Sequence, residues 1–180
     1  MTQPIDFSRP IAVQQLGAGE NRMRIEATPS ERESLARRFN LVGLESLNAQ
    51  LRLRRIGGSR LVRLHGRLQA DVVQTCVVSL QEVRSHVDET FEMLYGPPED
   101  IMPDGVDVMV NIDEDDPPEP IRHGLIDTGE AVAEHLALAL DPFPRAPGAR
   151  LDPALTMSDE PPEPHPNQFS ALESIKKNRE

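Results

Sequence analysis

Apolar and polar residues alternate with a period of two through the middle of the chain. Residues 47–53 and 62–68 each place an apolar residue, or glycine at position 66, at every second position, and Gly57-Gly58 separates the two runs. A period of two is that of β-strands, and a glycine pair has the backbone freedom that a tight hairpin turn needs. The pattern predicts an antiparallel hairpin, followed by a third long strand over residues 83–95.

A two-residue turn at Gly57-Gly58 also predicts the register of this hairpin. Leu53 then faces Val62 on the apolar side, and Arg52 faces Arg63 on the polar side. Like charges that face each other across two strands destabilise the pair. We therefore expect these arginines to be neutralised, either by an anionic partner or by carboxylates of the same protein.

Two helices are predicted from start signals and apolar spacing. Thr28 and Glu31 form a capping box, with Pro29 at the first helical position, and Asn40 follows the last apolar residue. A second capping pattern begins at Asp127 and precedes apolar residues at helical spacing, namely Val132, Ala133, Leu136 and Leu140.

These elements predict an α+β fold. Its centre is a twisted antiparallel β-sheet, either open or partly closed as a barrel, with one or two packed helices. We expect a single domain over residues 1–146. Residues 147–180 have no apolar period and are rich in proline, which predicts a disordered tail with a short helical segment near its end.

The charge is unevenly distributed along the chain. In total, 19 basic and 30 acidic residues give a net charge of −11, but residues 1–95 carry +2 (13 − 11) and residues 96–180 carry −13 (6 − 19). A partner responds to the nearby field, so a basic surface on the first half is compatible with an anionic ligand. No apolar run approaches the roughly 20 residues of a membrane span, and no signal peptide is visible, so we expect a cytoplasmic protein.

The hairpin supplies the candidate site for RNA phosphates, because guanidinium groups match phosphate in a bidentate way. The candidate residues are Arg52, Arg54, Arg63 and Arg67. In the competing interpretation, Asp88 and Glu92 of the next strand neutralise them in an internal charge lattice. Aromatic residues are scarce and none falls on the basic face, so any RNA contact is expected to read backbone and shape.

The acidic run Asp113, Glu114, Asp115 and Asp116 is the candidate site for a basic partner. It lacks the glycine and the spacing of a calcium loop, and the histidines lack metal-site spacing, so we expect neither a metal nor another cofactor. Cys76 lies in an apolar stretch typical of a buried, inert cysteine. Glu134 and His135 are adjacent on a helix and do not face each other, which disfavours an enzyme.

Three blocks of sequence together resemble one known family. They cover residues 25–38, residues 66–78 (Gly-Arg-Leu-Gln-Ala-Asp-Val-Val-Gln-Thr-Cys-Val-Val) and residues 126–145, which open with Ile-Asp-Thr-Gly-Glu. In this order they resemble the alphaproteobacterial form of the YceD family, named for accumulation of large-subunit ribosomal RNA. Many relatives carry Cys-x-x-Cys in the central block, where this chain has Cys76 and Ser79.

The resemblance implies a non-enzymatic factor in the biogenesis of the large ribosomal subunit, with ribosomal RNA or a basic ribosomal protein as partner. Because the second cysteine is replaced, a two-cysteine metal half-site is not expected here. The alternatives are a metal-dependent or hydrolytic enzyme that uses Glu134 or the acidic run, and a general protein-interaction module.

Overall fold

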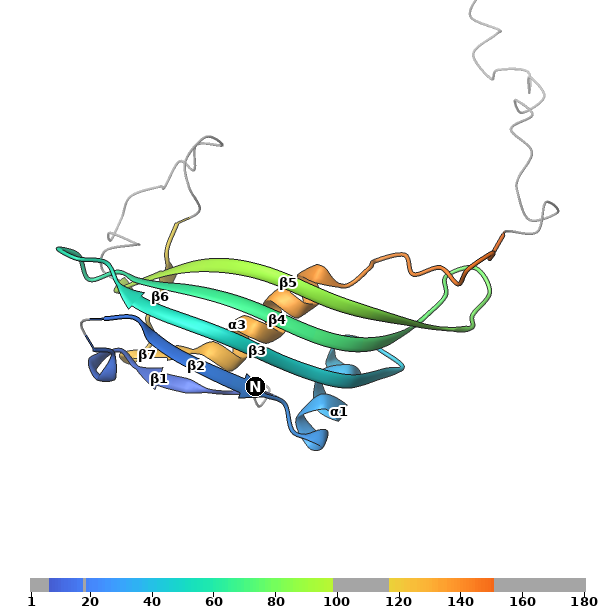
Figure 1. The fold of residues 1–180 in the computed structure, drawn as a ribbon, viewed down its shortest axis with the longest axis horizontal. Helices are drawn as coiled ribbons and strands as arrows, with labels where there is room; N and C mark the ends of the chain where they lie inside the picture. Colours follow the sequence, from blue (N-terminus) through green and yellow to red (C-terminus); the bar gives the residue numbers. More distant parts are fainter. Residues whose placement is uncertain (1–6, 18, 99–116, 151–180) are drawn as a thin grey trace, which may run out of the picture. The chain divides into compact units, whose positions relative to one another are not determined.

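A computed structural model of the chain describes residues 7–17, 19–98 and 117–150. The chain divides into two units, Met1–Gly148 and Ala149–Glu180, and every helix and strand described below belongs to the first (Figure 1). The acidic run at residues 113–116 and the predicted tail from residue 151 onward lie outside the described residues.

The main sheet of the described residues has five strands in the order β2-β3-β4-β5-β6. Their bounds are β2 Asn21–Glu26, β3 Gly43–Arg55, β4 Val62–Thr75, β5 Glu82–Gly96 and β6 Glu119–Pro120. All neighbours run antiparallel except β6, which pairs with β5 in parallel. Since β2 and β6 are edges, the sheet is open, which decides between the two alternatives that the sequence offered.

A second, two-stranded sheet joins segments that lie far apart in the sequence. β1 (Pro10–Ala12) pairs antiparallel with β7 (Leu125–Asp127), and a 3-10 turn, η1 (Val13–Gln15), follows β1. This small sheet ends where the second helix begins, so it fixes the start of that helix relative to the N-terminal segment.

Both predicted helix starts are confirmed. Helix α1 (Pro29–Arg38) has a complete capping box, in which the Glu31 N–H donates to Thr28 Oγ1 and the Thr28 N–H donates to the Glu31 carboxylate. Helix α3 (Thr128–Ala139) begins after Asp127, whose carboxylate accepts hydrogen bonds from the N–H groups of Gly129 and Glu130. These caps satisfy N–H groups that have no partner within the helix.

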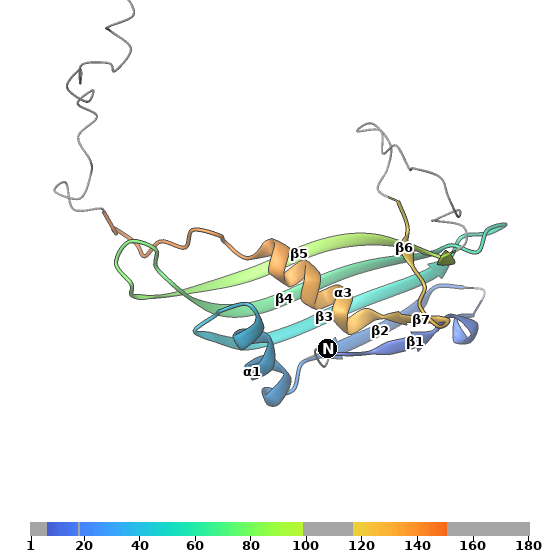
Figure 2. The same ribbon diagram turned by 180° about the vertical axis from the view of Figure 1, so that it is seen from behind.

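The two helices lie over the same face of the main sheet (Figure 2), where α1 contacts β3 and α3 contacts β4 and β5. The inward side chains of the predicted alternating runs are buried there, among them Leu47, Ala49, Leu51, Leu53, Leu64 and Leu68. Within the described ranges, neither helix is long and apolar enough to cross a membrane.

Gly66 of β4 allows α3 to approach the sheet closely. A Cβ atom at this position would lie 2.2 Å from Cζ of Phe91, so only glycine leaves room for the ring. The Phe91 ring also stacks on the imidazole of His135 from α3, with the ring centroids 4.1 Å apart. Overpacking of a core usually destabilises a protein, so this glycine is required by packing.

The predicted register of the hairpin is wrong by two residues. The Ile56 N–H donates to the Leu61 carbonyl, so the loop comprises residues 57–60 instead of two glycines alone. Leu53 therefore faces Leu64, and Arg52 faces His65. Because side chains repeat with a period of two, a shift of two residues keeps every side chain on its predicted face.

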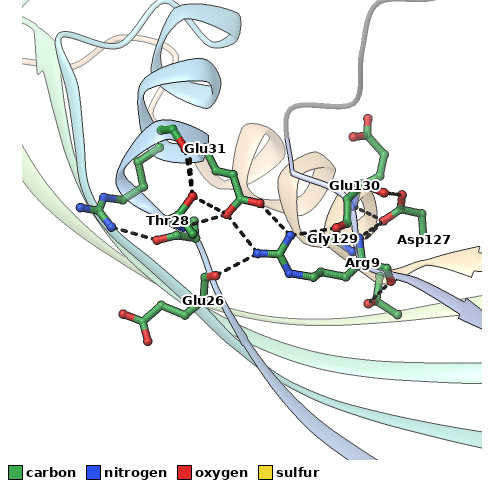
Figure 3. Close-up of polar contacts among 12 residues, drawn as sticks. Arg9, Glu26, Thr28, Glu31, Asp127, Gly129 and Glu130 are labelled. Atoms are coloured by element: carbon green, nitrogen blue, oxygen red, sulfur yellow. Dashed lines mark hydrogen bonds and ion pairs between the residues drawn. The ribbon is translucent and has the colours of Figure 1, made fainter.

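Arg9 connects the N-terminal segment to the start of α1 (Figure 3). Its guanidinium donates to both oxygens of Glu31, at 2.7 and 3.0 Å, and to the Glu26 carbonyl. The Arg9 N–H and the Ser8 hydroxyl both donate to Asp127, the residue that caps α3. We call Arg9, Glu31 and Asp127 the Arg9 cluster. It holds three segments together at a partly buried position.

Candidate functional site

The face of the main sheet opposite the helices, which is turned toward the reader in Figure 1, carries a group of arginines. Three neighbouring strands contribute them, and we call the group the arginine face: Arg22 and Arg24 from β2, Arg52 and Arg54 from β3, and Arg63 and Arg67 from β4. All six side chains are exposed. Within the described part of the chain, no helix covers this face (Figure 1).

A shallow, open groove of about 750 Å³ runs across the arginine face. Its polar lining comes from four strands and consists of Arg22, Arg24, Gln50, Arg52, His65, Arg67 and Thr90. The groove forms because outward side chains of adjacent strands stand side by side on a twisted sheet. Its lining carries no carboxylate.

Carboxylates of β5 neutralise the β4 side of the arginine face. Arg67 donates to both oxygens of Asp88, at 2.7 and 2.6 Å, and Arg63 lies 2.9 Å from Glu92. The hydrogen bonds from Arg67, helped by one from Gln69, lower the pKa of Asp88 to about 2. For Arg63 and Arg67, the internal charge lattice that the sequence offered as an alternative is therefore present.

The β2–β3 side of the face is different. Among the described residues, Arg24, Arg52 and Arg54 make no ion pair and no side-chain hydrogen bond, while Arg22 pairs with Glu20 at 2.5 Å. The hydrogen bond from Arg22 lowers the pKa of Glu20, and the more distant charges of Arg52 and Arg54 add to this effect. Of the four guanidinium groups on this side, Arg22 alone is paired with a carboxylate of the described residues.

Like charges are also direct neighbours across the strands. Arg22 pairs in register with Arg52, and Arg54 pairs with Arg63. Such pairs cost a few tenths of a kcal/mol in a two-stranded contact. The predicted pair of Arg52 with Arg63 is wrong, because Arg52 faces His65, but these other arginine pairs do face each other across the strands.

Sequence reasoning missed Arg22 and Arg24. The signal was present, because residues 21–25 alternate polar and apolar with arginine at both outward positions. What the sequence did not show is that β2 pairs with β3 in a register that puts these arginines beside Arg52 and Gln50. That pairing is long-range, and local periodicity does not encode it.

Cys76 lies at the β4–β5 turn, away from the groove. It is buried, as predicted, and its Sγ accepts hydrogen bonds from the N–H groups of Val78, Ser79 and Ala146 at 3.2–3.4 Å. These bonds, the one from Ala146 first, stabilise the thiolate and lower the pKa of Cys76 to about 6. The sequence did not predict this shift, because Ala146 is distant along the chain.

The residues considered for enzyme chemistry are dispersed. His135 stacks on Phe91, and burial lowers its pKa. Among the described residues, no group of three or more His, Cys, Asp or Glu side chains is placed to hold a metal ion. The described part of the acidic region begins at residue 117, so the structure does not place Asp113 to Asp116.

Comparison with known proteins identifies the family. A family model described as "Large ribosomal RNA subunit accumulation protein YceD" matches residues 64–176, which is more than half of the chain. Neither the curated proteins nor the solved structures that were compared give a match. The matched region contains most of β4 and all of β5 and α3, which supply one side of the groove and the helix that supports the sheet. The chain therefore belongs to the YceD family, as the resemblance of its three sequence blocks implied.

Proposed function

We propose that this protein is a non-enzymatic factor in the biogenesis of the large ribosomal subunit and binds ribosomal RNA through phosphates on the arginine face. The observation that carries the proposal is that Arg24, Arg52 and Arg54 lack a carboxylate partner among the described residues. They stand on an uncovered sheet face, and Arg24 and Arg52 line its groove. The family description supports the process, and a cytoplasmic location is consistent with it.

Physical chemistry favours phosphate as the ligand. A guanidinium group donates two parallel hydrogen bonds to a phosphate and keeps its charge at any physiological pH. Binding also releases counterions from the RNA, which contributes favourable free energy at moderate salt. The net charge of −11 does not oppose this, because the field at the groove is set by groups within about one Debye length, roughly 8–10 Å.

The four arginines predicted from the sequence then divide into two roles. Arg52 and Arg54 are available for direct phosphate contact. Arg63 and Arg67 are held by Glu92 and Asp88, so a phosphate would have to compete with a carboxylate that is already in place. We therefore assign the main phosphate contacts to Arg24, Arg52 and Arg54, because Arg22 is likewise paired with a carboxylate, that of Glu20.

A basic ribosomal protein is the competing partner. The sequence supports it through the acidic run at residues 113–116, which lies outside the described residues. A general protein-interaction module would require neither the arginine face nor the acidic run. Both alternatives are outcomes of the experiment below.

Ultraviolet crosslinking in a bacterial extract, followed by sequencing of the bound RNA, tests the proposal. Wild-type protein should crosslink to large-subunit ribosomal RNA, and replacement of Arg52 and Arg54 by alanine should remove most of that signal. Arg37→Ala, on α1 and off the groove, is the charge-matched control and should leave it intact. Crosslinks to proteins alone, or RNA crosslinks that do not depend on Arg52 and Arg54, would contradict the proposal.

A further inference from the structure

The geometry of the arginine face points to double-helical RNA, and not single-stranded RNA, as the ligand of the groove. This inference rests on the proposed function and specifies the class of RNA. Three observations carry it: the side chains that the face lacks, the polar groups that it leaves without partners, and the openness of the groove.

The first observation is that no aromatic ring is available for stacking. The aromatic side chains of the main sheet, Phe91 and Tyr95, lie on the helix side and are buried, with exposed fractions of 5% and 7%. No aromatic residue lines the groove. Proteins that bind single strands rely on bases stacked on aromatic side chains. A face without such rings gives an unpaired base little to bind.

The second observation is a pair of polar side chains in the groove, one on β3 and one on β5, that have no hydrogen-bond partner among the described residues. Gln50 follows Arg24 across the sheet, and Arg67 and Thr90 come next, so cationic and neutral polar groups alternate along one row. Neither Gln50 nor Thr90 makes a side-chain hydrogen bond to another described residue. Both groups donate and accept hydrogen bonds.

An A-form RNA duplex carries hydrogen-bonding groups and phosphates that match this row of side chains. Its minor groove is wide and shallow and displays 2′-hydroxyl groups, which also donate and accept, between two phosphate backbones. With one backbone on the β2–β3 arginines, the 2′-hydroxyl groups would meet Gln50 and Thr90. B-form DNA has no 2′-hydroxyl group, so the same row disfavours it.

The third observation is the form of the groove itself. It spans four strands and is open to solvent instead of forming a closed channel. Its central side chains stand on β3 and β4, which have a strand on each side and therefore move little. A broad, pre-organised surface fits a stiff convex duplex, whereas a flexible single strand would lose more conformational entropy on binding to it.

Fluorescence anisotropy with three labelled probes tests the inference on the full chain. The probes are a mixed-sequence RNA duplex of about 16 base pairs, one of its strands alone with no self-complementarity, and the DNA duplex of the same sequence. We expect the RNA duplex to bind at least about tenfold more tightly than either of the other two probes.

A double variant, Gln50→Ala with Thr90→Val, tests the 2′-hydroxyl contacts separately from the phosphate contacts. It should weaken binding of the RNA duplex about fivefold to tenfold and leave the DNA duplex unchanged, because no charge is altered. The matched control replaces the same residue types outside the groove, Thr75→Val at the end of β4 with Gln81→Ala just before β5, and should change nothing. Circular dichroism confirms that each variant is folded.

The outcomes are distinguishable. Equal or tighter binding of the single strand would overturn the inference and leave the proposed function standing. Equal binding of RNA and DNA duplexes, or no effect of the Gln50 and Thr90 variant, would overturn the role of the 2′-hydroxyl contacts and with it the inference. Absence of binding to every RNA probe would overturn the proposed function itself.

Discussion

Arg9 and three arginines of the arginine face have opposite surroundings. Arg9 donates to both oxygens of Glu31, to the Glu26 carbonyl and to the Ser8 carbonyl, and its side chain is only 29% exposed. Arg24, Arg52 and Arg54 stand on an open face and contact no carboxylate among the described residues. Arg9 stabilises the fold, whereas the three exposed arginines add repulsion to it.

The difference indicates how charge is used in each place. A partly buried guanidinium needs all its partners within the protein, because the alternative is an uncompensated charge. An exposed guanidinium is solvated by water and stays available to an external anion. The β4 arginines are intermediate, since Arg67 is exposed but already bound to Asp88. This contrast leads to four predictions, each of which concerns either the Arg9 cluster or the arginine face.

Arg9→Ala should have the largest effect on stability. The substitution leaves Glu31 without its strongest partner and removes the cation–π contact with Phe7, so we expect a loss of about 3 kcal/mol in the free energy of unfolding. Urea unfolding followed by circular dichroism measures it. Arg24→Ala is the control and should change stability by no more than about 0.5 kcal/mol. Similar losses for both variants would contradict the contrast.

Acid should weaken the Arg9 cluster in a defined pH range. The bond from Arg9 lowers the pKa of Glu31 to about 2, below the 4.5 expected for the unfolded chain. The folded-state pKa is the lower one, so the stabilisation is complete above pH 4.5 and is lost as the pH falls toward 2.

For this carboxylate, 20% exposed, we expect a loss of about 2 kcal/mol over that range. Unfolding curves at several pH values measure the loss in wild type and Glu31→Gln. The difference in stability between the two proteins should shrink toward pH 2. A constant difference would mean that Glu31 does not carry the pH dependence.

Removal of Arg52 and Arg54 together should separate binding from stability. We expect the double alanine variant to bind an RNA duplex about tenfold less tightly, which corresponds to about 1.4 kcal/mol. Its unfolding free energy should not decrease, because neither side chain has an internal partner among the described residues. Anisotropy and urea unfolding on the same preparations test both parts. A large loss of stability would show that these arginines are structural.

The smallest expected effect is a gain. Arg52→Thr removes the like-charge pair with Arg22 and places a good strand former on β3, so stability should rise by a few tenths of a kcal/mol. The gain should be smaller in high salt, where the repulsion is screened. If stability falls at low salt, Arg22 and Arg52 do not repel each other.

Local patterns predicted much of this fold. The capping box at Thr28, the cap at Asp127 and the alternating faces of β3 and β4 are all encoded within a few residues. The register was wrong because Ser59 and Arg60 belong to the loop, and composition does not fix loop length. The Arg9 cluster was missed because its partners are separated by 22 and 118 positions.

The candidate site was only partly predicted, because some of its residues are brought together by strand pairing that is distant along the chain. Arg52 and Arg54 were identified from the hairpin, but their neighbours Arg22 and Arg24 come from a strand whose pairing is non-local. The neutralisation of Arg67 by Asp88 was offered as an alternative and could only be decided by the pairing of β4 with β5. Sequence thus specified which residues face outward, and tertiary pairing specified which of them are left without partners.

The most direct test of the central claim is the salt dependence of RNA binding. Affinity for the RNA duplex is measured between 50 and 300 mM salt, chosen as roughly the range where counterion release dominates, for wild type and the Arg52→Ala, Arg54→Ala variant. If both guanidinium groups contact phosphates, the logarithmic slope should be smaller by about 2 in the variant. Equal slopes would show that the partnerless arginines do not touch the RNA backbone.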